Sequence, residues 1–169
     1  MSLATYERFE LSLGKKWTKE EFRKGILDFE EELKKVDGAL VGHEMDDSMC
    51  PVKHTFVEGA YIREMFIPKG VIITSKIHKT VHPYFLMRGD ISIATEDGIV
   101  RLVAPHSGVS KFGSKRIAFT HADTVWITVH VTQHTDLNKI EEEVIAPTFE
   151  DLPKMLESDN TRRILCHGE

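Results

Sequence analysis

The early part of the chain has the hydrophobic spacing of an amphipathic helix. Apolar residues recur at intervals of four, three, four and three, which places them on one helical face. The residues of this face are Phe22, Ile26, Phe29, Leu33 and Val36. Thr18 and Glu21 have the spacing of a capping box at the start, and Asp37-Gly38 predicts the end. We expect this helix to dock on the rest of the domain or on a second subunit.

From Tyr61 to Val131 the pattern changes to short runs rich in Ile, Val, Thr and Phe, separated by turn residues. Ile91, Ile93 and Ile99 alternate with polar residues, as a half-buried strand requires. The strands predicted in this way are 60–67, 71–78, 84–88, 90–95, 99–103, 115–120 and 124–131. Short strands with a turn about every ten residues indicate an antiparallel sandwich or barrel.

Turn residues and the flanking segments complete this prediction. Pro68-Lys69-Gly70 predicts one turn, and Asp97-Gly98 predicts a two-residue hairpin in which both positions have positive φ. Residues 39–58 have no regular pattern and are expected to be irregular. In the acidic tail we expect a helix around 139–144 and a short second helix near 150–156.

Composition narrows the class of protein. A chain of 169 residues with a net charge of -5 fits one domain, and without a basic tract it is a poor partner for a nucleic-acid polymer. Two cysteines far apart, Cys50 and Cys166, favour free thiols in a reducing compartment. No apolar run reaches the ~18 residues of a membrane span, and Met1–Ala4 does not begin a secretion signal. We therefore expect a cytoplasmic protein that binds no membrane.

Histidines are the candidate functional residues of this chain. The chain has nine of them, and His78 and His82 border a transition between predicted strands. In a continuous strand a separation of four residues places both rings on the same face. Imidazoles that converge inside an apolar barrel suit one divalent transition metal such as Zn, Ni, Fe or Cu.

The spacing around these histidines resembles the first motif of the cupin superfamily, which is Gly, five residues, His-x-His, three or four residues, Glu, six residues and Gly. Here Gly70 precedes the segment Lys76–His82 by the same five residues, and six residues separate His82 from Gly89. The second motif, Pro-x-Gly-x-x-His, resembles Lys111–Arg116. The family's four ligand positions then fall on Lys76, His78, His82 and Arg116, of which only His78 keeps the family's residue.

A second resemblance covers most of residues 50–147 and is to uncharacterised cupin-like proteins of bacteriophages and bacteria. The segments that carry it are Cys50–Phe56, Tyr61–Glu64, Ile77–Lys79, Ala104-Pro105, Gly113–Arg116 and Asp123–His130. It implies a cytoplasmic location in a bacterium or in a phage-infected host cell, and it implies no reaction.

The resemblance implies an all-β fold, namely a cupin-type antiparallel β-barrel (jelly roll) with an N-terminal helix and a short helical C-terminal tail. We expect one domain over 1–169, with a helical extension at 1–49, the barrel at 58–131 and the tail at 132–169. A homodimer is expected as well, since exposed sheet edges need to be covered.

Three interpretations of the pocket remain open. In the first, His78 and His82 bind a metal with His130 as third ligand, or else His121. In the second there is no metal, and Lys76, Arg116 and two histidines line a cationic pocket for a carboxylate, phosphate or nucleotide. In the third the histidines are structural.

The function hypotheses follow from these interpretations. The leading one is a cupin-like small-molecule enzyme, with or without a metal. The alternatives are a non-catalytic binding protein for a small anionic ligand, such as a nucleotide or sugar, and a structural or virion-associated protein. The sequence leaves open whether the chain is an enzyme. Tyr61 is a further candidate for ligand binding, through its phenol group.

Overall fold

The predicted helix is present in the computed structural model, which describes residues 17–35, 41 and 49–153. Helix α2 spans Lys19–Leu33 and begins with the predicted capping box. The Thr18 hydroxyl accepts from the Glu21 amide at 3.2 Å, and the Glu21 carboxylate accepts from the Thr18 amide at 2.8 Å. Phe22, Ile26 and Leu33 are buried, as the periodicity predicts, while position 36 lies outside the described residues.

The strands form two main antiparallel sheets and one short pair, and each predicted strand corresponds to at least one observed strand. In the five-stranded sheet the order is β1 (Val52–Val57), β2 (Ala60–Ile67), β10 (Thr124–Val131), β5 (His82–Arg88) and β8 (His106–Ser110). In the four-stranded sheet it is β3 (Ile72–Thr74), β9 (Ile117–Thr120), β6 (Asp90–Thr95) and β7 (Gly98–Val103). The short pair is β4 (Ile77–His78) with β11 (Ile145–Ala146).

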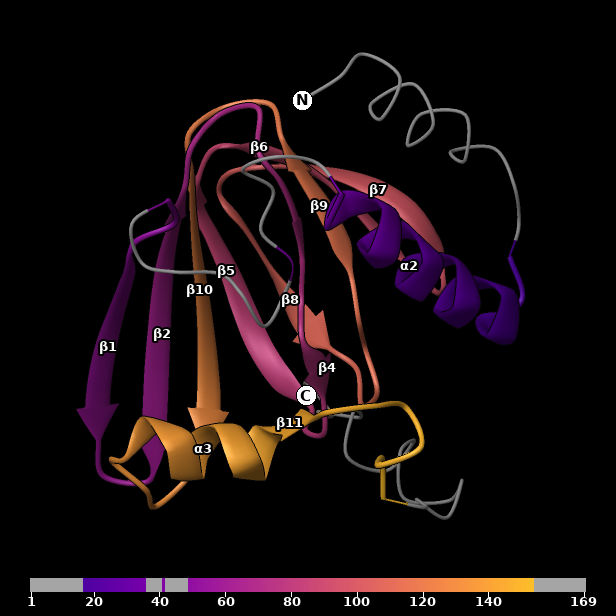
Figure 1. The fold of residues 1–169 in the computed structure, drawn as a ribbon. Helices are drawn as coiled ribbons and strands as arrows, with labels where there is room; N and C mark the ends of the chain where they lie inside the picture. The colour runs from indigo at the N-terminus through magenta and orange to yellow at the C-terminus, as the bar shows by residue number, and fades with distance from the viewer. Residues whose placement is uncertain (1–16, 36–40, 42–48, 154–169) are drawn as a thin grey trace, which may run out of the picture.

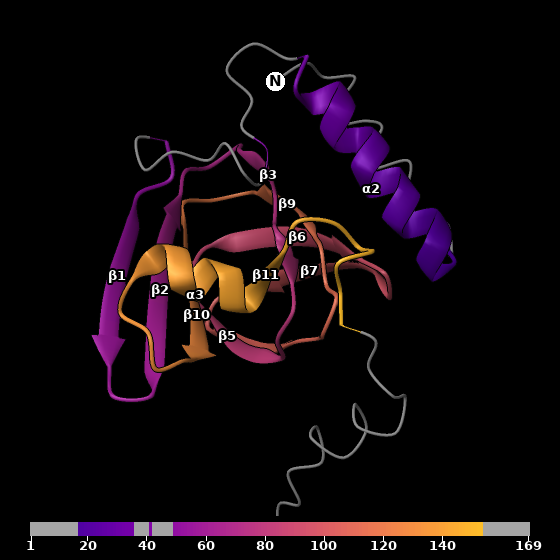
Figure 2. The ribbon, with the colours of Figure 1, turned by 60° about the horizontal axis from the view of Figure 1, so that its bottom comes forward.

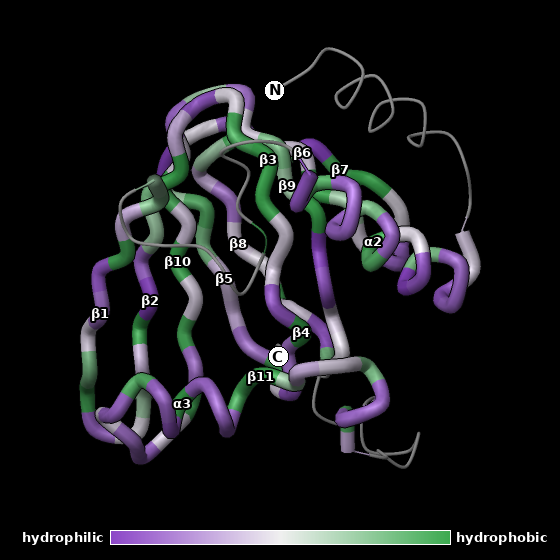
Figure 3. Tube along the Cα trace, viewed as in Figure 1, coloured by the Kyte–Doolittle hydropathy of each residue, from purple (hydrophilic) through white to green (hydrophobic). Residues whose placement is uncertain are grey.

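The two main sheets pack face to face around one core, and the chain is all-β in class. Met65, Leu86 and Trp126 from the five-stranded sheet join Ile91 and Ile93 from the four-stranded sheet in one buried cluster. Figure 1 shows the two layers, and Figure 3 shows hydrophobic and hydrophilic residues alternating along the strands. This alternation is the pattern from which the strands were predicted.

The helices lie outside this core. Helix α2 packs on the outer side of the four-stranded sheet, where Phe22 and Ile26 join a second cluster with Ile117 and Phe119. Helix α3 (Leu137–Val144) crosses one end of the five-stranded sheet, as Figure 2 shows. Neither helix of the described part of the chain is long and apolar enough to cross a membrane.

The structure corrects the expectation that residues 39–58 are irregular. Strand β1 covers Val52–Val57 and pairs with β2, although its apolar and polar residues do not alternate. Strand β8 was also missed, because His106–Ser110 has no clear apolar alternation. Its Gly108 is required by packing, since a Cβ atom there would lie 2.5 Å from the Tyr84 hydroxyl. Strands β1 and β8 therefore form because they pair with β2 and β5, and not because their own sequences favour a strand.

The predicted hairpin turn is displaced by one residue. Thr95 pairs with Gly98, so that the two loop residues are Glu96 and Asp97. Gly98 has φ +113°, whereas no non-glycine residue of the described chain has positive φ, so Asp97 does not adopt the predicted conformation. The Thr95 hydroxyl accepts from the Asp97 amide at 3.2 Å and donates to the Gly98 carbonyl at 3.1 Å, which stabilises the observed turn.

Two further expectations need correction. The predicted strand 71–78 is divided, because β3 pairs with β9 whereas β4 pairs with β11. The helix predicted near 150–156 is a turn over residues 150–151, followed by a bend at 152, and residues 154–156 lie outside the described chain.

A buried ion pair joins α2 to the barrel and gives a first testable prediction. Lys115 Nζ lies 2.7 Å from Glu30 Oε1, and the two side chains are 4% and 13% exposed. We expect Glu30→Gln to lower the free energy of unfolding by about 3 kcal/mol, because it leaves a buried ammonium without its counter-charge. Chemical denaturation measures the change.

The matched control is Asp28→Asn on the same helix, where Asp28 and Lys24 form an exposed pair. That substitution is expected to change stability little, because solvent screens the pair. Equal effects of the two substitutions would contradict the assigned role of the buried pair.

Candidate functional site

His82 and His130 face each other across two neighbouring strands. Strands β5 and β10 are antiparallel, and Tyr84 lies opposite Thr128. Two residues further along each strand, the same register places His82 opposite His130. Both side chains point inward and are 2% and 3% exposed. Their ring centroids are 4.3 Å apart.

His78 completes a cluster of three imidazoles. Its ring centroid lies 4.5 Å from that of His82 and 5.9 Å from that of His130. It belongs to β4, which is held in place by pairing with Ile145 of β11. His78 and His82 therefore meet as predicted, but from two separate strands rather than from one face of a continuous strand.

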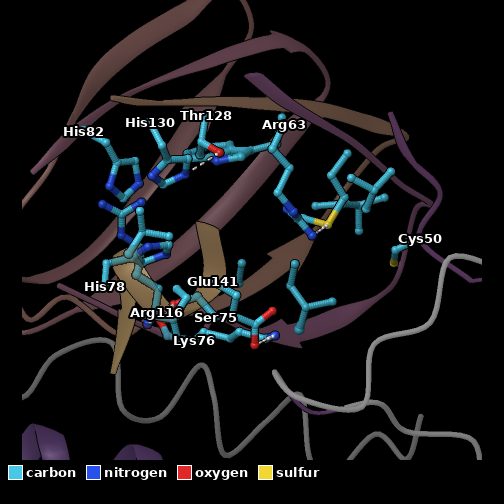
Figure 4. A pocket seen from close by; sticks show the side chains of 18 of the residues that line it. Cys50, Arg63, Ser75, Lys76, His78, His82, Arg116, Thr128, His130 and Glu141 are labelled. Atoms are coloured by element: carbon cyan, nitrogen blue, oxygen red, sulfur yellow. Dashed lines mark hydrogen bonds and ion pairs between the residues drawn. The ribbon is translucent and has the colours of Figure 1, made fainter. Parts of the chain in front are cut away.

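The cluster lies at one end of a cavity of about 300 Å³ between the two sheets. Figure 4 shows the three rings and Arg116 together at that end, with Arg63 and Cys50 on the opposite side. The wall between is mainly apolar. It includes Met65, Ile73, Ile91, Ile93, Ala118 and Trp126. The cavity thus combines a polar end with an apolar interior, as small-molecule sites usually do.

Burial keeps the three imidazoles neutral. Desolvation lowers the pKa of His82 to about 4 and that of His130 to about 3, and it lowers the pKa of His78 well below the usual 6.5. The charge of Arg116 lowers the pKa of both His78 and His82 further. At neutral pH each ring therefore carries one N–H donor and one lone pair.

Several ring nitrogens of the cluster are available to a ligand. Nδ1 of His82 lies 3.1 Å from the Thr80 carbonyl and donates to it, which leaves the lone pair on Nε2. Nε2 of His130 is 3.1 Å from the Thr128 hydroxyl. Nδ1 of His78 and Nδ1 of His130 are buried and have no hydrogen-bond partner among the described residues. Buried polar atoms without partners are uncommon and point to a missing group.

Arg116 is a buried cation beside this cluster. Its guanidinium donates to the Ser110 hydroxyl at 2.8 Å and lies 5.2 Å from the centroid of the Tyr84 ring. Nε is buried without a hydrogen-bond partner, and desolvation lowers the pKa of the side chain. No carboxylate of the described chain forms an ion pair with it.

Two lysines near Arg116 differ from it, because each forms an ion pair with a carboxylate. Lys76 lines the cavity as predicted, but its Nζ lies 2.5 Å from Glu141 Oε1 of α3. Lys115 is paired with Glu30 in the same way. Of the two predicted cations, Arg116 therefore retains its charge for a ligand, whereas that of Lys76 is compensated.

Tyr61 also lines the cavity, as predicted, and is only 4% exposed. Its hydroxyl is 2.7 Å from Nδ1 of His54, and its ring lies 6.0 Å from that of His130. His54 and Arg63 were not expected in the pocket. Arg63 could have been found from the strand alternation, because it shares the inward face of β2 with Tyr61. His54 could not, because it lies on β1, which the sequence pattern does not predict.

His121, the second choice for a third metal ligand, does not line the cavity. Its Nε2 lies 2.8 Å from the Ser92 hydroxyl, and its ring packs edge-on against Phe119. These contacts place it with the residues of the four-stranded sheet that face α2. His106 and His134 are exposed.

The spacing of the three rings meets one requirement of a metal site. Nitrogen ligands about 2 Å from one ion place their ring centroids about 5 Å apart, which agrees with the observed distances. However, in the described part of the chain no group of three or more His, Cys, Asp or Glu side chains is arranged to hold an ion. The buried Arg116 also adds positive charge at this position. The donor chemistry and the ring spacing therefore suit a borderline metal, but in the described part of the chain the three rings are not oriented toward one ion position.

The burial of the three imidazoles predicts a pH dependence of stability. The unfolded chain takes up protons below pH 6.5, whereas folded His82 and His130 stay neutral down to about pH 4 and 3. Lowering the pH from 7 to 5 should therefore cost on the order of 2 kcal/mol of unfolding free energy for each of these histidines. Urea denaturation at the two pH values measures this loss.

The double substitution His82→Gln with His130→Gln should make the free energy of unfolding change less between pH 7 and pH 5. The exposed His106→Gln serves as the control and should leave the slope as it is in the parent chain. An unchanged slope in the double variant would show that other groups cause the dependence.

No protein-family model matches the chain, and no curated protein matches it. Among solved structures it is similar to KdgF from Halomonas sp., with 12% identity, a TM-score of 0.47 and coverage of 55% of this chain and 90% of that one. An RmlC-like cupin from Shewanella frigidimarina has 12% identity, a TM-score of 0.45 and coverage of 53% and 81%. A cupin superfamily protein from Desulfitobacterium hafniense has 10% identity, a TM-score of 0.44 and coverage of 52% and 82%. At these identities the likeness to cupin and RmlC-like structures concerns the fold alone.

Proposed function

We propose that the barrel cavity binds a small molecule with an anionic group and an apolar body. The anionic group would pair with Arg116, and the apolar body would extend between the sheets. The observation that carries the proposal is the buried guanidinium of Arg116, which has no carboxylate partner in the described chain and a buried Nε without a hydrogen bond.

The cost of an uncompensated buried charge supports an anionic ligand. Removing a cation from water costs several kcal/mol unless a counter-charge and hydrogen bonds compensate for it. Lys76 and Lys115 both receive a carboxylate, from Glu141 and from Glu30. A guanidinium provides paired N–H donors in a planar arrangement that matches a carboxylate or phosphate, so an anion from outside the chain would supply what is missing.

The neutral imidazoles would select and orient this ligand. Unlike protonated histidines they do not repel Arg116. His78 and His130 can each donate one hydrogen bond to an anion, whereas the N–H group of His82 is used by the Thr80 carbonyl. With pKa values of about 4 and 3, His82 and His130 are weak bases at neutral pH. A weak base contributes little to proton abstraction, so these residues favour binding over general-base catalysis in the ligand-free protein.

The apolar wall defines the rest of the ligand. The cavity wall beyond the polar end includes Ile91, Ile93 and Trp126. The cavity volume of about 300 Å³ is at the small end of the range for ligand sites. A short aliphatic or single-ring body would fit this space. Carboxylates of this kind are the simplest probes.

A homologous series of straight-chain carboxylates, from acetate to octanoate, tests the proposal. Affinity measured by calorimetry should rise by about fourfold for each added methylene until the cavity is full, because each buries apolar surface. Alcohols of the same length should bind at least 10-fold more weakly, because they have no charge to pair with Arg116.

Arg116→Met should reduce carboxylate affinity at least 10-fold while leaving the ligand-free protein as stable as the parent or more stable. The reason is that the substitution removes an uncompensated buried charge. Arg88→Met, in an exposed arginine, is the control. If Arg116→Met unfolds the protein or leaves carboxylate binding intact, the proposal is wrong.

A metal-dependent enzyme is the second candidate, and the close approach of the rings of His78, His82 and His130 favours it. These residues would hold the ion, and the ion would supply Lewis-acid chemistry. Elemental analysis of tag-free protein, purified without added metal, distinguishes the candidates. Stoichiometric Zn, Ni, Fe or Cu that is lost in His78→Ala with His82→Ala would support the metal, whereas metal-free protein that binds carboxylates would support the first candidate.

A further inference from the structure

The cavity contains a second arginine, Arg63, on the side opposite Arg116. Strand β2 directs Tyr61, Arg63 and Met65 inward, and all three line the cavity. Nη2 of Arg63 lies 3.5 Å from Sδ of Met65, a weak acceptor that takes one of the several N–H donors of the guanidinium. Figure 4 shows the Arg63 side chain directed away from the three imidazoles. Arg63 therefore places a cation at the end of the cavity that is far from Arg116.

The strand register indicates how far apart the two arginines are. Thr128 of β10 lies opposite Arg63 on one side and opposite Tyr84 on the other, so these three residues form one row across the sheet. Neighbouring strands are about 4.8 Å apart, which separates the Cα atoms of Arg63 and Tyr84 by roughly 10 Å. The guanidinium of Arg116 lies over the Tyr84 ring, 5.2 Å from its centroid. The two arginines thus belong to opposite ends of this row.

Positive charge exceeds negative charge among the described residues that line the cavity. The cationic residues are Arg63, Lys76 and Arg116, and the acidic one is Glu141. Glu141 compensates Lys76, as described above, and burial keeps the histidines neutral. The described lining therefore carries two positive charges in excess, one at each end of the cavity.

The charge of Arg63 acts inside the cavity. Desolvation is the main reason for the low pKa values of His78 and His130, and the charge of Arg63 lowers both pKa values further. Arg116 acts on His78 in the same direction. Charges in the interior of a protein are screened less than charges on its surface. An anion between the sheets is therefore attracted from both ends of the cavity.

We infer that the ligand of this cavity is an anion with two heads, an α,ω-dicarboxylate or a molecule of the same form. One carboxylate pairs with Arg116 and the other with Arg63. The inference rests on the proposed function, to which it adds the second anionic group. A guanidinium at each end matches a carboxylate, and the apolar wall between them suits a methylene chain. The distance between the two arginines then selects the length of the ligand.

A second carboxylate on the ligand has opposite effects on affinity with and without Arg63. In an apolar cavity that lacks a second cation, the added charge loses its hydration without compensation, and this weakens binding. With Arg63 in place, the added charge gains a charge-assisted pair of hydrogen bonds, and this strengthens binding. The sign of the difference between monocarboxylates and dicarboxylates therefore reports on Arg63.

Calorimetry with dicarboxylates from succinate to suberate, and with monocarboxylates of equal carbon number, tests the inference at neutral pH. The best dicarboxylate should bind about 10-fold or more tightly than its monocarboxylate. Affinity should be highest at an intermediate chain length, because the span between the arginines is fixed. In Arg63→Met the order should reverse, while monocarboxylate affinity changes by less than about threefold, since that carboxylate lies at the other end.

Lys53→Met is the matched control. Lys53 is exposed on the neighbouring strand β1 and does not line the cavity, so the variant loses the same charge and should keep the preference for dicarboxylates. Arg63→Lys retains the charge and should keep part of the preference, and it replaces Arg63→Met if that variant does not fold. Circular dichroism verifies folding.

The outcomes separate this inference from the proposed function. Monocarboxylates that bind through Arg116, together with dicarboxylates that bind no more tightly, would overturn the inference and leave the proposed function in place. A preference for dicarboxylates that survives Arg63→Met would overturn the inference as well, because the second carboxylate would then bind elsewhere. If neither class of ligand binds, both are wrong.

Discussion

The alternation of side chains along the central strands is the constraint on which the core, the cavity and the outer surface all depend. Because successive residues of a strand point to opposite faces, β10 sends Trp126 into the core and His130 to the polar end of the cavity. The same period sends Ile127 and Val129 outward. A shift of one residue in the register with β5 would exchange these sets, so the site and the core are specified together.

Electrostatics distinguishes the polar end of the cavity from the rest of the interior. Lys76 and Lys115 each have a carboxylate within ion-pair distance, and both pairs connect a helix to a strand region: Glu141 belongs to α3 and Glu30 to α2. Arg116 has instead a hydroxyl and an aromatic ring as neighbours. The helices therefore serve in part to neutralise charge around the barrel, and the charge of Arg116, which they do not pair, lies next to three neutral imidazoles.

Helix and strand periods were sufficient to predict most elements. The capping box at Thr18 and the apolar face of α2 could be read directly, because both are properties of residues close together in sequence. Strands β1 and β8 could not be predicted, because segments without apolar alternation, such as Val52–Val57, become strands only through the partners with which they pair. The displaced hairpin has a similar origin, since the Thr95 side chain, and not Gly98 alone, determines which residues form the loop.

The sequence by itself determined the class of fold and the pair His78 and His82, because periodic burial and short spacings are local properties of a chain. Tertiary structure alone decided that Glu141 compensates Lys76 and that Arg116 remains without an acid partner in the described chain. These residues are separated by tens of positions and meet only after two sheets and α3 have packed. The charge balance of a buried site depends on such distant neighbours, and no spacing along the chain encodes it.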